Sequence, residues 1–144
     1  LSGLVGSEMC IRDRKMTIRH THPLRPTVAG GAAAAREWMQ RRTSAVIAHN
    51  DLMAMGFMIA VKSVGIEVPR DVSVVGTDNI FMSALFTPAL TTVTTSRNTQ
   101  GKLAFNQLLE QLRHQHRDTG HLTTSIAMKL VERDSTAQVP SLHR

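Results

Sequence analysis

Short apolar runs of strand length alternate along this chain with longer segments of helical periodicity. Four runs are typical of buried strands, at residues 45–49, 72–75, 90–95 and 124–131. Three longer segments have apolar residues three or four apart and predict helices, at residues 27–42, 52–64 and 98–115. Strands that alternate with helices form βαβ units with parallel strands. The sequence therefore predicts an α/β fold with a parallel sheet flanked by helices.

Local signals refine two of these helices. Segment 52–64 is apolar almost all round, which predicts a helix buried on more than one side. Asp51 is expected to cap its N-terminus, and Gly65 suits the position just after its C-terminus. Gly30 and Gly31 are expected to weaken the first turn of the helix at 27–42. Residues 80–87 form a connection that is compatible with a short helix.

Composition limits the class of protein. The chain has 144 residues, 42% of them hydrophobic, which suffices for one domain or part of one. It has no apolar run of about 18 residues and no signal peptide, so neither a membrane span nor export is expected. Cys10 is the single cysteine, which excludes an intramolecular disulfide.

The positive charge is unevenly distributed. The formal net charge is +6, and residues 15–50 hold six basic residues against one acidic residue. A basic excess can indicate nucleic-acid binding. However, aromatic residues make up only 3% of the chain, and it contains no helix-turn-helix or zinc-finger motif. A solvated helix face is the expectation for this segment.

Short polar side chains follow two of the expected strands. Asn50 and Asp51 come after the run at 45–49, and Asp78 and Asn79 come after the run at 72–75. In parallel sheets, ligands bind beyond the carboxyl ends of the strands. Amide and carboxylate groups suit sugar hydroxyls or nucleoside edges. The alternative is purely structural, with Asp51 as a helix cap and Asp78 as a turn former.

The sequence holds only weak motifs for metal binding and none that predicts catalysis. A metal site could be considered at His114, His116 and His121. However, histidines two residues apart lie on different faces of a helix, and no cysteine or acid completes the ligand set. The chain has no glycine-rich phosphate loop, no Gly-x-Ser-x-Gly motif and no evident carboxylate pair. We therefore expect no metal, no cofactor and no enzymatic activity.

Four segments, taken in order and with their spacing, resemble the effector domain of LacI/GalR-type transcriptional regulators. They are TSAVIAHNDLMAMG at 43–56, GIEVPRDVSVVGTDN at 65–79, TPALTTV at 87–93 and LVERDST at 130–136. The resemblance implies a partial periplasmic-binding-protein-like type I fold, in which two α/β lobes are hinged around a ligand cleft. This chain would supply mostly the second lobe.

The resemblance also implies a domain organisation. Residues 15–136 would form a partial effector-binding domain, and residues 137–144 a polar tail. Residues 1–14 resemble translated adapter sequence, so we expect them to be a non-native leader. Residues 90–95 would cross between the lobes, and the helix at 98–115 would pack on the first lobe. Without that lobe, we expect an exposed apolar patch on this helix.

By resemblance, four residues are expected to contact the effector: Asn50, Asp78, Thr95 and Arg97. Asp78 would accept hydrogen bonds from ligand hydroxyls. Arg97 would pair with an acidic effector, or it is simply a solvated surface residue. The expected effector is a sugar, a sugar acid or a nucleoside-like molecule.

The resemblance further implies a cytoplasmic homodimer that binds operator DNA through an N-terminal helix-turn-helix absent from this chain. Five residues are expected at the dimer interface, with core packing as the alternative for the methionines: Met55, Met58, Ile59, Leu85 and Phe86. Effector binding would shift the lobes and change the spacing of two DNA-binding heads. The main alternative is a solute-binding protein of a sugar ABC transporter, and an enzyme with a Rossmann-like half is a third.

Overall fold

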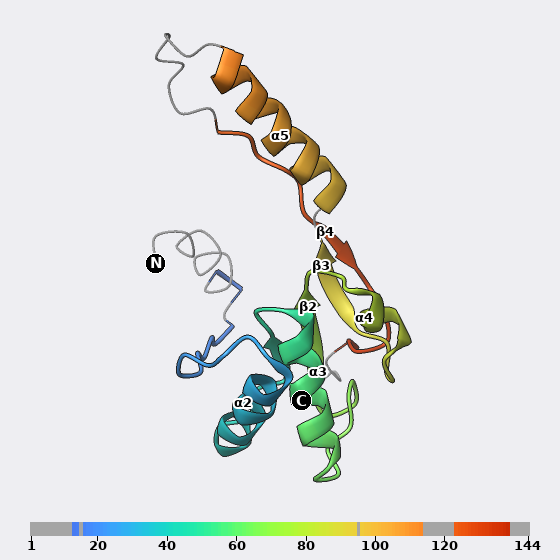
Figure 1. Cartoon of the computed structure of the whole chain (residues 1–144). Helices are drawn as coiled ribbons and strands as arrows, with labels where there is room; N and C mark the ends of the chain where they lie inside the picture. The colour runs from blue at the N-terminus through green and yellow to red at the C-terminus, as the bar shows by residue number, and fades with distance from the viewer. Residues whose placement is uncertain (1–12, 15, 95, 114–122, 139–144) are drawn as a thin grey trace.

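A computed structural model describes residues 13–14, 16–94, 96–113 and 123–138. Helices and strands alternate in the expected order (Figure 1). The elements are α2 (Val28–Gln40), β1 (Ala45–Ile47), α3 (Asp51–Lys62), β2 (Ser73–Thr77), α4 (Phe81–Leu85), β3 (Thr91–Thr94), α5 (Arg97–Arg113) and β4 (Lys129–Val131). The expected leader at 1–14 lies almost wholly outside these ranges, as do Thr95 and the three histidines considered as metal ligands.

The four strands form one sheet in the order β1-β2-β3-β4. The strands β1, β2 and β3 are parallel, as predicted, but β4 runs antiparallel to β3. A parallel fourth strand would need a crossover that packs on the sheet. Instead, α5 leads away from the sheet, and the chain returns alongside it to β4 (Figure 1). The predicted parallel sheet flanked by helices is confirmed, with β4 added as one antiparallel edge strand that the alternation did not predict.

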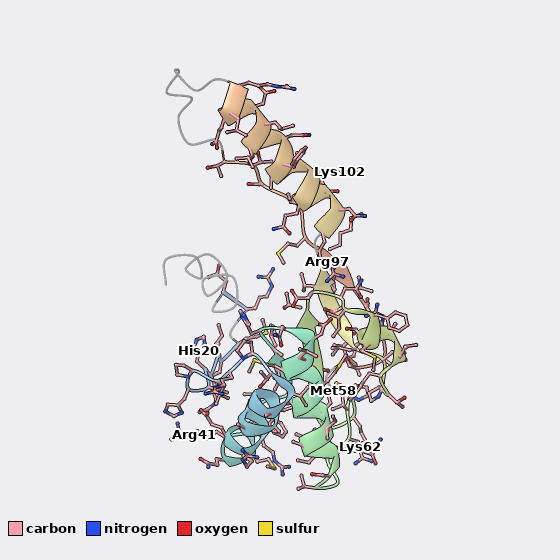
Figure 2. All side chains as sticks on the ribbon, viewed as in Figure 1. His20, Arg41, Met58, Lys62, Arg97 and Lys102 are labelled. Atoms are coloured by element: carbon pink, nitrogen blue, oxygen red, sulfur yellow. The ribbon has the colours of Figure 1, made fainter. Side chains whose placement is uncertain are left out.

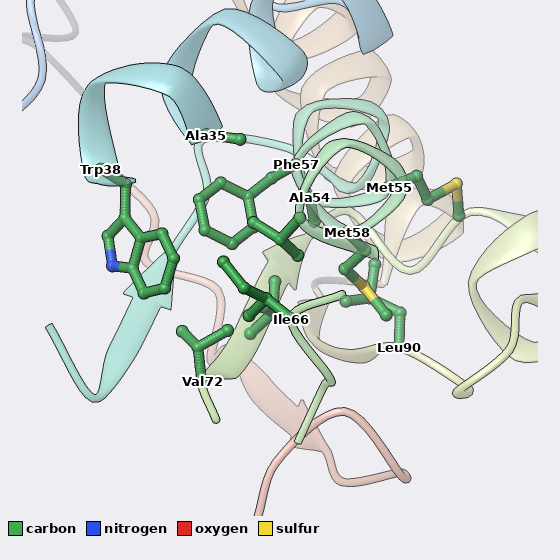
Figure 3. Close-up of a cluster of buried hydrophobic side chains, with 11 residues drawn as sticks. Ala35, Trp38, Ala54, Met55, Phe57, Met58, Ile66, Val72 and Leu90 are labelled. Carbon is green, nitrogen blue, oxygen red and sulfur yellow. The ribbon is translucent and has the colours of Figure 1, made fainter. Parts of the chain in front are cut away.

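The core lies between α2, α3 and the sheet (Figure 3). Its buried apolar residues are Ala35, Trp38, Ala54, Met55, Phe57, Met58, Val61, Ile66, Val72, Val74 and Leu90. The rings of Trp38 and Phe57 meet edge to face, with centroids 5.4 Å apart. Such a pair contributes about 0.5–1.5 kcal/mol beyond the burial of its area. The prediction that the helix at 52–64 is buried on more than one side is confirmed.

Two glycines allow α2 and α3 to approach closely. A Cβ atom on Gly31 would overlap the backbone carbonyl of Met53, and one on Gly56 would overlap the backbone carbonyl of Val28. Each helix therefore presents a glycine to the backbone of the other. The sequence interpretation of Gly31 as a weak point described only its local cost, because the packing that requires it involves residues of another helix.

The ends of α3 are fixed by side-chain and backbone hydrogen bonds. The Asn50 Oδ1 atom accepts a hydrogen bond from the Met53 N–H at 2.8 Å, so Asn50 caps the helix. The expected cap, Asp51, is instead the first helical residue. At the other end, Gly65 has φ 79° and donates its N–H to the Lys62 carbonyl, while Ile66 donates to Val61. The predicted role of Gly65 is confirmed.

The segment after β4 is attached to the first residues of the parallel strands. Ser135 is fully buried, and its Oγ donates to the Val74 carbonyl at 2.6 Å and accepts the Thr91 N–H at 2.8 Å. Ala137 donates its N–H to the Ser73 Oγ at 3.1 Å. These bonds anchor the return segment to the sheet, so that the residues between β4 and Ala137 have fixed positions relative to β2 and β3.

Helix α5 has no buried residue. Its apolar side chains Phe105, Leu108 and Leu112 are 60%, 52% and 54% exposed. The exposed apolar face expected for this helix is therefore present. In the described ranges, no helix is both long enough and apolar enough to cross a membrane.

Candidate ligand-binding site

The carboxyl ends of the three parallel strands meet at one edge of the sheet, called here the carboxyl edge. The Asp78 N–H donates to the Val93 carbonyl at 2.8 Å, and the Thr77 Oγ1 donates to the Ala48 carbonyl at 3.3 Å. These contacts join the ends of β1, β2 and β3 side by side. Ligands bind at such edges in parallel α/β sheets, so the polar residues that follow the strands are the candidate site.

Asp78 and Asn79 form a turn of sparsely populated backbone conformation directly after β2. Their φ angles are 103° and 49°, a range that residues with a side chain rarely adopt. Asp78 is exposed, and its carboxylate receives no hydrogen bond or ion pair from any residue in the described ranges. Unusual backbone of this kind occurs often at functional sites. The turn therefore presents an open acceptor group at the carboxyl edge.

Arg97 is the first residue of α5, where this helix joins the sheet (Figure 2), and a hydrogen bond to Asp78 places it beside this turn. Its Nη1 atom is 3.5 Å from the Asp78 backbone carbonyl, a long and weak hydrogen bond. Its side chain is exposed and pairs with no carboxylate in the described part of the chain. The structure thus places Arg97 and Asp78, two of the expected effector contacts, next to each other, with most of the guanidinium donors open to solvent.

Asn50 follows β1 at the same edge, but its amide is partly occupied. Besides capping α3, it donates from Nδ2 to the Pro26 carbonyl at 3.1 Å, which attaches the N-terminal segment to the helix. An amide has two N–H donors and two acceptor lone pairs, so one of each remains. Asn50 has a structural role here, and no described contact links its side chain to Asp78.

A hollow of about 350 Å³ lies next to Asn50. It is lined by Thr21, His22, Pro23, Leu24, Pro26, His49 and Met53. The hollow could not be predicted from the sequence, because residues 15–26 show no helical or strand periodicity. The hollow is mostly apolar, with two imidazoles on its wall.

Asp51 lies behind the carboxyl edge and is fully buried. Its Oδ1 accepts the Thr92 hydroxyl at 2.6 Å, and its Oδ2 accepts the Ser83 hydroxyl at 2.5 Å and the Ile80 N–H at 2.9 Å. These three donors come from β3, from α4 and from the residue before α4. Asp51 therefore connects three elements and does not face a ligand.

The residues expected at a dimer interface separate into two groups. Met55 and Met58 are only 5% and 3% exposed and pack in the core (Figure 3). Ile59 and Leu85 are 52% and 61% exposed, and Phe86 is half-buried against the core. The methionines are therefore covered by the chain itself, whereas Ile59 and Leu85 are accessible to a partner.

One pair of groups with shifted pKa values lies away from this edge. Hydrogen bonds from the Arg70 guanidinium and from the Glu67 N–H lower the pKa of Asp71, and the same carboxylate raises the pKa of Arg70. Both side chains are exposed. Asp71 precedes β2, so this pair lies at the opposite edge of the sheet and has no part in the candidate site.

Comparisons with known proteins identify the family. The model of the periplasmic binding protein-like domain matches residues 7–136. The HTH-type transcriptional repressor PurR of Edwardsiella ictaluri is 40% identical over 101 residues, which cover 70% of this chain and 29% of that protein. Such relatives are transcriptional repressors rather than enzymes, in agreement with the prediction that the chain has no catalytic activity.

Solved structures of the same type share the fold. A LacI-type transcription regulator from Bifidobacterium animalis subsp. lactis is 30% identical, with a TM-score of 0.78 over 92% of this chain and 49% of that one. The Escherichia coli repressor ascG is 29% identical, with a TM-score of 0.76 over 93% of this chain and 49% of its own. The chain thus spans about half the length of these structures. It belongs to the family of periplasmic binding protein-like domains, the family of the effector-binding domain of LacI/GalR-type regulators.

Proposed function

We propose that this chain is the effector-sensing part of a LacI/GalR-type transcriptional regulator that acts in the cytoplasm. A small polar ligand binds at the carboxyl edge, and a helix-turn-helix elsewhere in the whole protein binds the operator. The observation that carries this proposal is the open carboxylate of Asp78, held on a turn of unusual backbone where ligands of α/β sheets bind. The repressor relatives support the regulatory role.

The chemistry of the edge favours a sugar, a sugar acid or a nucleoside-like molecule. A carboxylate that lacks internal donors is suited to accept hydrogen bonds from vicinal hydroxyls. The exposed guanidinium of Arg97 can bind an acidic group. Asn50 has one remaining donor and one remaining acceptor for the same ligand. Thr95, expected as a contact by resemblance, lies outside the described residues.

The ligand test uses this chain with D-ribose, D-gluconate and inosine, each titrated by calorimetry. We expect one of the three classes to bind, and Asp78→Asn to weaken that binding by about tenfold to a hundredfold, because a charged acceptor is lost. Asparagine tolerates the backbone conformation of this turn. Asp134→Asn is the matched control, since Asp134 is also exposed but lies outside the carboxyl edge. Unchanged binding in Asp78→Asn, or binding of none of the three, would contradict the proposal.

We also propose that the protein forms a homodimer through the exposed apolar surface of Ile59 and α4. Within α4, Phe81, Met82 and Leu85 are 80%, 50% and 61% exposed, and Ile59 is 52% exposed. Exposed apolar residues gathered on one short helix commonly mark interfaces. A dimer would pass a change at the ligand site to two DNA-binding heads by shifting the population of lobe arrangements.

The dimer prediction is tested by sedimentation velocity. Leu85→Glu is expected to weaken self-association by at least about tenfold, because a charge would be buried without a partner. Leu112→Glu on α5 is the control, since that residue is similarly exposed but distant from α4. If Leu112→Glu dissociates the protein and Leu85→Glu does not, association occurs through α5 and the α4 surface is not the interface.

A further inference from the structure

Arg133 links the segment after β4 to the turn that carries Asp78. Its Nη1 atom donates to the Leu90 carbonyl at 2.6 Å, and its Nη2 atom donates to the Asn79 Oδ1 at 2.7 Å. Arg133 is half-buried. Both distances are short for N–H···O bonds, as charge-assisted bonds are. One guanidinium therefore ties the turn after β2 to the residue just before β3.

The turn needs such a restraint because two successive residues have positive φ angles and neither is glycine. The backbone of Asn79 is otherwise held weakly, since its N–H reaches the Thr92 Oγ1 only at 3.3 Å. The bond from Arg133 to the Asn79 side chain is the strongest polar contact of that residue in the described ranges. The N–H groups of Asp78 and Ile80 hold only the two ends of the turn, so without this bond Asn79 itself can relax toward ordinary backbone angles and redirect the neighbouring Asp78 side chain.

Arg133 is itself rigidly placed. Its N–H donates to the Thr91 Oγ1 at 2.9 Å, and the same hydroxyl lies 3.2 Å from the Arg133 carbonyl. The next two residues, Asp134 and Ser135, donate their N–H groups to the Ala89 carbonyl at 3.0 and 2.9 Å. The guanidinium therefore projects from a backbone attached to the strand next to the turn. A planar fork can reach two acceptors at once, which a lysine ammonium does not do in the same geometry.

We infer that Arg133 is a positioning residue of the ligand-binding site, which fixes Asn79 in its left-handed conformation and so presents the Asp78 carboxylate at the carboxyl edge. The effect of Arg133 on the turn can be measured without any ligand. Its effect on ligand affinity rests on the proposed function, so the two effects are measured in separate experiments.

Amide hydrogen exchange tests the effect on the turn. In Arg133→Met we expect the amides of Asp78 and Asn79 to exchange about tenfold faster, while the amides of α3 keep their rates. Asn79→Ala alone should also speed exchange at the turn, because both changes remove the Arg133–Asn79 bond. Arg133→Met also removes the bond to the Leu90 carbonyl, so the double variant should exchange no faster at the turn than Arg133→Met. Arg133→Lys should recover part of the protection. Unchanged exchange at the turn, or an equal increase throughout α3, would overturn the inference.

Titration with D-ribose, D-gluconate and inosine tests the effect on the ligand. If one of them binds the unmodified chain, Arg133→Met should weaken it by about tenfold, and Arg133→Lys by less. Unchanged affinity together with faster exchange at the turn would overturn the positioning role. If none of the three binds the unmodified chain, the proposed function fails, whereas the exchange measurement still decides whether Arg133 holds the turn.

Discussion

Replacing Asp51 with alanine is expected to lower the free energy of unfolding by about 3–5 kcal/mol. The carboxylate is fully buried and accepts hydrogen bonds from the Thr92 hydroxyl, the Ser83 hydroxyl and the Ile80 N–H. Alanine would leave these donors without a partner, and each unsatisfied buried donor costs about 1–3 kcal/mol. The carboxylate also lies in the first turn of α3, where the helix dipole favours a negative charge.

Urea denaturation followed by circular dichroism measures this loss. Asp51→Asn keeps the shape of the side chain but replaces one acceptor with a donor, so this variant should lose an intermediate amount of unfolding free energy. Asp134→Ala is the control, because this exposed side chain makes no described hydrogen bond, and its change should stay within about 0.5 kcal/mol. A loss below about 1 kcal/mol for Asp51→Ala would mean that the buried network contributes little to stability.

Replacing Gly56 with alanine is expected to destabilise the protein by about 3 kcal/mol. The added methyl group would overlap the Val28 carbonyl of α2 and force the two helices apart. Alanine is intrinsically better than glycine in a helix by about 1 kcal/mol, so the packing clash must exceed this gain. The effect is large because the neighbouring atom belongs to the backbone and cannot rotate away as a side chain would.

The same substitution at Gly101 provides a matched control. Gly101 lies in α5 with no atom near the position of an added Cβ, so Gly101→Ala should stabilise α5 by up to about 1 kcal/mol. Thermal unfolding of both variants should therefore give shifts of opposite sign. If Gly56→Ala also raised the melting temperature, the close approach of α2 and α3 would not be essential to the fold.

Much of the fold follows from local patterns. Periodicity and turn chemistry act over a few residues, so they predicted the order of helices and strands, the burial of α3 and the left-handed Gly65. They also predicted that β1, β2 and β3 run parallel. The antiparallel β4 was not predictable from the alternation, since its direction depends on where α5 leads the chain. The expected cap of α3 was wrong by one residue, which is a common error at helix ends.

The site was less predictable than the fold. The sequence predicts Asp78 and Asn50 as ligand contacts because each follows a strand, and the structure places both at the carboxyl edge. The role proposed for Arg133 was not predictable, since the residue it contacts, Asn79, lies 54 positions away in the sequence. For Met55 and Met58 the sequence left a dimer interface and core packing open, because an apolar helix does not reveal which of its faces meets the sheet, and the structure places both in the core. The positions of these side chains depend on contacts between residues far apart in the chain, and such contacts cannot be predicted from the local pattern of one sequence.

The most direct test of the regulator proposal is the DNA sequence of the gene upstream of the Lys15 codon. We predict an in-frame region that encodes the first lobe of the fold and begins with a helix-turn-helix. A signal peptide in the position of the helix-turn-helix would contradict the account and indicate a solute-binding protein of a transporter instead.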